Sequence, residues 1–168
     1  SGNRAGLGNG IAASGYSKYD GNQAAWLNVY NTVPQLQTTA SILNTNLQSG
    51  FKYTLSFDAA ASTTSYATYA DLLAGTNVVM TAQVGSLTKN FASHQASEEF
   101  SPTPSDPSVG EALAIRLRVT GGSWNAQAYV DNLRLTKTDT SGDSTAPTPD
   151  PLTWSQVPTA VADGDIMM

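Results

Sequence analysis

Cysteine is absent from the 168-residue chain, which excludes disulfide bonds, thiolate metal sites and cysteine nucleophiles. Charged residues are scarce as well, at 12% of the sequence, roughly half their usual share in soluble proteins. The eight lysines and arginines form no basic run and the net charge is -5, so we expect no nucleic-acid partner. Because no stretch approaches about 18 consecutive apolar residues, we expect no membrane insertion.

With so few charges, the polar surface must come from Ser, Thr, Asn, Gln and Gly. This usage is common in extracellular β-proteins, including bacterial secreted proteins that fold without disulfides. We therefore expect a secreted or cell-surface bacterial protein.

Alternation of apolar and polar residues is the dominant pattern, and it predicts β-strands. It is clearest in FKYTLSFDAA (51–60), ALAIRLRVT (112–120) and AYVDNLRLT (128–136). The last segment breaks the pattern at Asp131-Asn132, where we expect a β-bulge.

Weaker segments of the same kind fill much of the remaining chain. They are AAWLNVY (24–30), PQLQTTA (34–40), YATYADLLAG (66–75), NVVMTAQVG (77–85) and ASEEFSP (96–102). Short strands separated by turn residues are typical of sandwiches and barrels, and long helical periodicity is missing. We predict an all-β, antiparallel β-sandwich of the jelly-roll type, with hairpin turns at Gly75-Thr76-Asn77 and Gly121-Gly122.

Composition divides the chain into three parts. Residues 1–137 carry the predicted sandwich, and 138–151 are rich in Thr, Ser, Asp and Pro, as in a linker. Residues 152–168 look strand-like but are too few to fold alone. We expect a monomeric module in a longer chain, followed by the start of another domain.

Three segments, in this order and spacing, resemble a known family. YDGNQAAWLNV (19–29), GFKYTLSFDA (50–59) and YVDNLRLT (129–136) look like the carbohydrate-binding modules of the xylan- and glucan-binding type, within the galactose-binding-like jelly-roll group. The resemblance implies a sandwich that binds a polysaccharide or oligosaccharide. The chain departs from the family at its start, since 1–10 lack the usual Phe-Glu pair.

The resemblance also implies a structural calcium, with Asp20 and Asp131 at the matching positions. Calcium takes several carboxylate and carbonyl oxygens, and the loop after Asp20 offers such oxygens. In the alternative interpretation, Asp20 is a turn residue and Asp131 accepts hydrogen bonds from backbone amides.

A sugar site needs an exposed aromatic ring beside planar polar groups. Alternation places such groups on outward rows of three strands, and a loop tryptophan could close one end. The candidate ligand-binding residues are Tyr69, Asp71, Arg116, Arg118, Trp124 and Asp58. The alternative is an ordinary solvated face with cross-strand Arg–Asp pairs, whereas Trp26, among apolar neighbours, is expected in the core.

The sequence offers no arrangement typical of a catalytic site. Glu98 and Glu99 are adjacent on a predicted strand and would point to opposite faces, so they cannot form a glycosidase pair. His94 is the single histidine, and no G-x-S-x-G motif accompanies it. We therefore predict a non-catalytic carbohydrate-binding module of a secreted modular protein, with a structural or adhesive surface module without a glycan ligand as the alternative.

Overall fold

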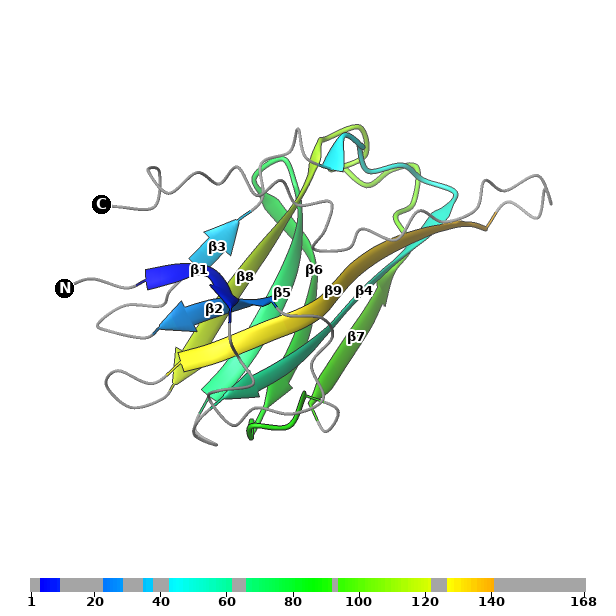
Figure 1. Cartoon of the computed structure of the whole chain (residues 1–168). Coiled ribbons are helices and arrows are strands. Elements are labelled where there is room, and N and C mark those ends of the chain that lie inside the picture. The colour runs from blue at the N-terminus through cyan, green and yellow to red at the C-terminus, as the bar shows by residue number, and fades with distance from the viewer. Residues whose placement is uncertain are drawn as a thin grey trace.

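The computed structural model describes residues 4–9, 23–28, 35–37, 43–61, 66–91, 94–121 and 127–140. In these ranges the chain forms two antiparallel sheets that stack as a sandwich (Figure 1). The all-β, jelly-roll-like sandwich predicted from alternation is therefore confirmed. None of the described residues forms a helix that could cross a membrane.

One sheet has five strands and contains the last strand of the described chain. Its order is β1 (Arg4–Asn9), β2 (Gln23–Asn28), β9 (Gln127–Asp139), β4 (Phe51–Ala61) and β7 (Gln95–Phe100). The strands β4 and β9 pair over most of their length and form the centre of this sheet. Because β9 continues to Asp139, the folded part extends two residues beyond the predicted boundary at Lys137.

The second sheet has four strands. Its order is β3 (Gln35–Gln37), β8 (Leu113–Gly121), β5 (Tyr66–Ala74) and β6 (Asn77–Gly85). The central strands β5 and β8 are in register over nine residue pairs, from Tyr66↔Gly121 to Ala74↔Leu113. This long antiparallel pairing fixes which side chains of the two strands share a face.

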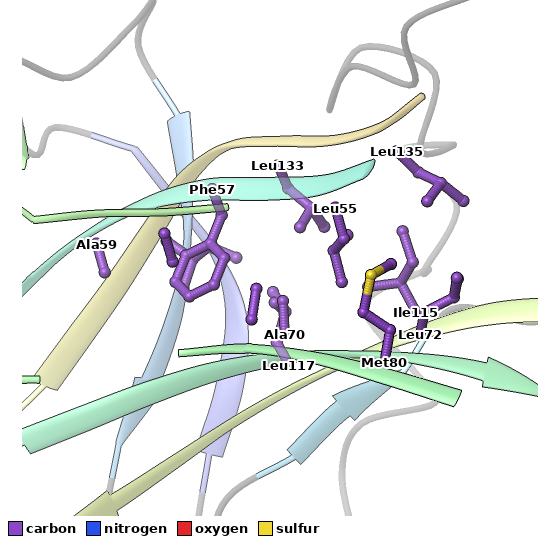
Figure 2. Packing of buried hydrophobic residues seen from close by; sticks show 14 of the residues in the cluster. Leu55, Phe57, Ala59, Ala70, Leu72, Met80, Ile115, Leu117, Leu133 and Leu135 are labelled. Atoms are coloured by element: carbon purple, nitrogen blue, oxygen red, sulfur yellow. The ribbon is translucent and has the colours of Figure 1, made fainter. Parts of the chain in front are cut away.

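The main core lies between the sheets. Leu55 and Phe57 on β4 point toward Leu72 on β5 and Leu117 on β8, and each of these side chains is almost fully buried (Figure 2). These are the apolar positions of the alternating segments, so burying every second side chain accounts for the strand pattern.

A second, smaller cluster lies on the other face of the five-stranded sheet. It contains Ala24, Ala60, Phe91 and Tyr129, with Trp26 packed against it. Ala24, Trp26, Ala60 and Tyr129 alternate along their strands with residues of the main core, so they point to the outer face. The sequence prediction placed Trp26 in the core; it packs instead in this outer cluster and remains partly exposed.

The structure supports one of the two predicted hairpins. Gly75, with a φ of 60°, and Thr76 form the turn between β5 and β6, as expected. The Gly121-Gly122 hairpin is wrong, because β8 and β9 belong to different sheets and this connection crosses from one sheet to the other. Alternation marks both strands equally well and does not specify their partners.

The predicted irregularity at Asp131-Asn132 is confirmed as a register shift. Asp58 pairs with Asp131 whereas Ser56 pairs with Arg134, so β9 carries an extra residue here. Asn132 adopts the left-handed conformation, with a φ of 50°. The shift lets Val130 and Leu133 both face the main core.

Candidate functional site

Four of the predicted ligand-binding residues come together on the outer face of the four-stranded sheet. Asp71 on β5 is directly opposite Arg116 on β8, and Tyr69 is directly opposite Arg118. Their strand neighbours Ala70 and Leu117 are buried in the main core, so the four side chains point away from it. The sequence prediction that they share one face is therefore met by the geometry.

The Asp71 carboxylate is the centre of this group. Arg118 donates from Nε and Nη2 to its two oxygens at 2.7 and 3.1 Å. Arg116 donates from Nε and Nη2 to Oδ2 at 3.0 and 2.8 Å. From the third strand, Thr81 Oγ1 donates to Oδ1 at 2.8 Å. Side chains from β5, β6 and β8 thus converge on one carboxylate.

These contacts determine the charge state of Asp71. Burial alone would raise the pKa of this carboxyl, but the hydrogen bonds from Arg118, Arg116 and Thr81 outweigh burial and lower it. The hydrogen bond to Asp71 in turn raises the pKa of Arg118. Asp71 is therefore an anion near neutral pH and is unsuited to donate a proton.

Arg118 also lies against an aromatic ring. Its guanidinium carbon is 4.0 Å from the centroid of the Tyr69 ring, within the range of a cation–π contact. The Tyr69 hydroxyl accepts a hydrogen bond from Thr120 Oγ1 at 3.4 Å. We call the group the Asp71 cluster, and it comprises Tyr69, Asp71, Thr81, Arg116, Arg118 and Thr120.

The remaining predicted ligand residues do not join this cluster. Asp58 is on β4 of the five-stranded sheet, so the expectation that it shares a face with Asp71 is wrong. Alternation shows which residues of one strand share a face, but it does not show which sheet the strand enters. Asp71 was predicted to be exposed to solvent, but its side chain is fully buried beneath Arg116 and Arg118. Trp124 lies outside the described residues.

Thr81 is a member of the cluster that sequence reasoning missed. It lies opposite Asp71 on β6, in one of the segments predicted as a strand. Alternation alone could have placed Thr81 on the outward face, but the pairing of β5 with β6 was needed to put it beside Asp71.

A second polar group lies on the outer face of the five-stranded sheet. Asp58 and Asp131 are paired residues on β4 and β9, and both are at least nine-tenths buried. Asn132 connects them: its backbone N–H donates to Asp131 Oδ1 at 2.8 Å, and its Nδ2 donates to Asp58 Oδ2 at 2.8 Å. That Asp58 lies opposite Asp131 could not be predicted from the sequence, because the pairing of β4 with β9 was not known.

The calcium prediction can be compared with this second group. Carboxylate and amide oxygens are suitable calcium ligands, and Asp58 adds a carboxylate that the prediction did not include. Within the described ranges, however, no three His, Cys, Asp or Glu residues are placed to hold a metal. Asp20 lies outside these ranges. The described residues therefore do not complete a calcium shell.

Comparison with known proteins decides the family. The family model described as HpiC1-like, HpiC1 cyclase, matches residues 3–136, which include both polar groups. The chain belongs to the HpiC1-like cyclase family. No curated protein matches it in sequence.

Solved structures agree with this assignment. A cyclase from Fischerella sp. TAU in complex with 4-(1H-indol-3-yl)butan-2-one is 25% identical, with a TM-score of 0.60, and the match covers 80% of this chain and 75% of that chain. The Stig cyclase Fisc from the same organism, in complex with (3Z)-3-(1-methyl-2-pyrrolidinylidene)-3H-indole, is 24% identical, with a TM-score of 0.59 and coverage of 80% and 74%. The HpiC1-like chain and these cyclases share the sandwich fold.

Membership of the HpiC1-like family overturns the predicted function. The identification as a carbohydrate-binding module is wrong, and so are the polysaccharide ligand and the statement that the chain is not an enzyme. The described parts of the three segments behind the resemblance lie in strands β2, β4 and β9 of a sandwich, and a shared sandwich does not determine a ligand.

Proposed function

We propose that this protein is an enzyme that cyclises a small, indole-bearing substrate. The observation that carries the proposal is the HpiC1-like family match over residues 3–136. Related cyclases are described with small indole-derived ligands, and the one with 25% identity supports the same ligand class here. A small aromatic substrate replaces the polysaccharide expected from the sequence.

The Asp71 cluster supplies groups suited to binding and orienting such a substrate. It has the Tyr69 ring, the rigidly held donors of Arg116 and Arg118, and a buried counter-charge. Ring closure within one molecule is accelerated when the reacting ends are held in the right orientation, and fixed hydrogen-bond donors serve that purpose. We therefore assign substrate orientation to this cluster.

The same geometry excludes Asp71 as the source of a proton. Its lowered pKa and its bonds to two guanidinium groups keep it ionised, whereas a general acid needs a pKa near the working pH. Any protonation step in the proposed reaction must therefore use a group other than Asp71.

Turnover of indole substrates tests the proposal. The protein is incubated with indoles whose 3-substituent carries an alkene, because ring closure onto an indole needs an unsaturated partner. A cyclisation without loss of atoms gives a product of unchanged mass and a new retention time in liquid chromatography–mass spectrometry. Heat-denatured protein is the control, and NMR of the product identifies the new ring. Absence of any isomer above that control across the substrate panel would contradict the proposal.

A further inference from the structure

We propose that the Arg118 guanidinium is a stacking site for a planar aromatic ring, with Tyr69 on one face, the ligand ring on the opposite face and Asp71 as its positioning residue. We infer that this ring is the indole of the substrate. The identity of the ring therefore rests on the proposed function.

The burial of Asp71 shows which groups form the surface. Asp71 points to the outer face of the sheet, yet its side chain has 0% exposure. Arg116 and Arg118 bind its carboxylate and keep 23% and 25% of their own side chains exposed. The two arginine side chains therefore cover the carboxylate and keep part of their own surface exposed to solvent.

The plane of the Arg118 guanidinium is fixed from two directions. Its Nε and Nη2 donate to both oxygens of Asp71, which sets the orientation of the guanidinium in the manner of a bidentate pair. The Tyr69 ring lies 4.0 Å away and supports it. A flat cation held in this way loses little conformational freedom when a second ring stacks on it.

The chemistry of the cluster selects the ligand class. A guanidinium attracts the electron-rich face of an aromatic ring, and indole provides the strongest such face among the protein aromatic side chains. Two arginines and one aspartate leave a net charge of 2 − 1 = +1 in the cluster. A neutral or anionic indole is therefore favoured over one with an ammonium group on its side chain.

The Arg118→Lys variant tests the stacking directly, because it keeps the positive charge and removes the planar face. The matched control is Arg134→Lys, which makes the same exchange at an exposed arginine of β9 on the other sheet. Binding of 4-(1H-indol-3-yl)butan-2-one is measured by calorimetry, and thermal melting checks the fold of each variant. We expect Arg118→Lys to weaken binding about three- to thirty-fold and Arg134→Lys to leave it unchanged.

Kinetics and ligand charge distinguish stacking from a general structural effect. With an indole substrate that the protein cyclises, Arg118→Lys should raise KM by about the same factor as it weakens binding of the ketone, and should change kcat less. Asp71→Asn should have a smaller effect in the same direction, because an amide still accepts hydrogen bonds but lacks the charge. Wild-type protein should bind the neutral indole ketone more tightly than tryptamine, whose side chain carries an ammonium group.

A measurement on the wild-type protein covers the case in which the variants do not fold. Addition of the indole ketone should shift the NMR signal of the Arg118 Nε–H group by the ring current of the stacked indole and leave that of Arg134 in place. If the wild type binds the ketone while Arg118→Lys binds equally well or the Arg118 signal does not move, the stacking proposal is overturned and the proposed function stands. If the wild type binds no indole ketone and forms no cyclised product, both proposals fail.

Discussion

Asp58 and Asp131 are opposite each other on β4 and β9, and Asn132 donates one hydrogen bond to each carboxyl group. Two carboxylates in a largely buried place repel one another unless donors or a cation compensate their charge. The bulge at Asn132 provides two of those donors. In its left-handed conformation, Asn132 donates hydrogen bonds to both carboxyl groups and so stabilises the buried pair.

The backbone of Asn132 provides the first prediction. At a φ of 50° a residue other than Gly or Asn costs about 1–2 kcal/mol. Asn132→Gly loses the hydrogen bond to Asp58 but keeps the backbone, whereas Asn132→Ala loses the bond and adds strain. We expect Asn132→Ala to be the less stable of the two by about 1 kcal/mol, measured by urea unfolding. Equal free energies of unfolding for the two variants would contradict a strained backbone at this position.

The second prediction is that the protein binds a stabilising calcium ion, which we propose from the sequence and from the Asp58–Asp131 pair. The Asp58–Asp131 pair, together with Asp20, would provide oxygen ligands, and an ion that binds only the folded state stabilises it by about 2.7 kcal/mol at a concentration of 100 times its Kd. We expect calcium to raise the melting temperature and EDTA to reverse the rise. Asp131→Asn should abolish the response, and Asp106→Asn, in the loop between β7 and β8, should retain it. A melting temperature that is the same in calcium and in EDTA would argue against the site.

Acid stability is the third prediction. Because the folded-state pKa of Asp71 is lowered, Asp71 stabilises the fold above its unfolded pKa of about 3.9 and loses this contribution as the pH falls toward the folded pKa. We expect Asp71→Asn to reduce the free energy of unfolding by about 1–3 kcal/mol at pH 7. The deficit relative to wild type should shrink below about pH 4. A deficit that stays constant from pH 7 to pH 3 would rule out the charge of Asp71 as its cause.

Much of the fold could be predicted because alternation has a direct physical cause. Leu55 and Leu117 are buried on one side of their strands, and the polar residues next to them are more exposed, so the pattern identifies both the strand and its core face. The irregularity at Asp131-Asn132 could also be predicted, because an extra residue in a strand interrupts the alternation of apolar and polar residues.

The alternating pattern did not predict which strands pair with one another. Tyr69 and Asp71 could be grouped with Arg116 and Arg118 because β5 and β8 are in fact neighbours. Asp58 was grouped with them by the same logic and lies on the other sheet. Long-range pairing depends on how the whole set of strands packs, and a local pattern does not contain that information.

The ligand class was beyond what the predicted fold could provide. A row with Tyr69, Arg116 and Arg118 is compatible with a sugar, a small aromatic molecule or a solvated surface. The sequence did not show that Asp71 is buried and accepts hydrogen bonds from both arginines. These bonds hold the guanidinium groups of Arg116 and Arg118 in place. The proposed function rests on the HpiC1-like family match.

The proposed function requires that the protein bind a small indole-bearing molecule. Saturation-transfer NMR tests it in one tube that contains the protein, 4-(1H-indol-3-yl)butan-2-one and a xylan oligosaccharide at equal concentrations. We expect saturation of the protein to reach the indole ring protons and not the sugar protons. Transfer to the oligosaccharide with none to the indole would contradict the proposal that the protein acts on an indole.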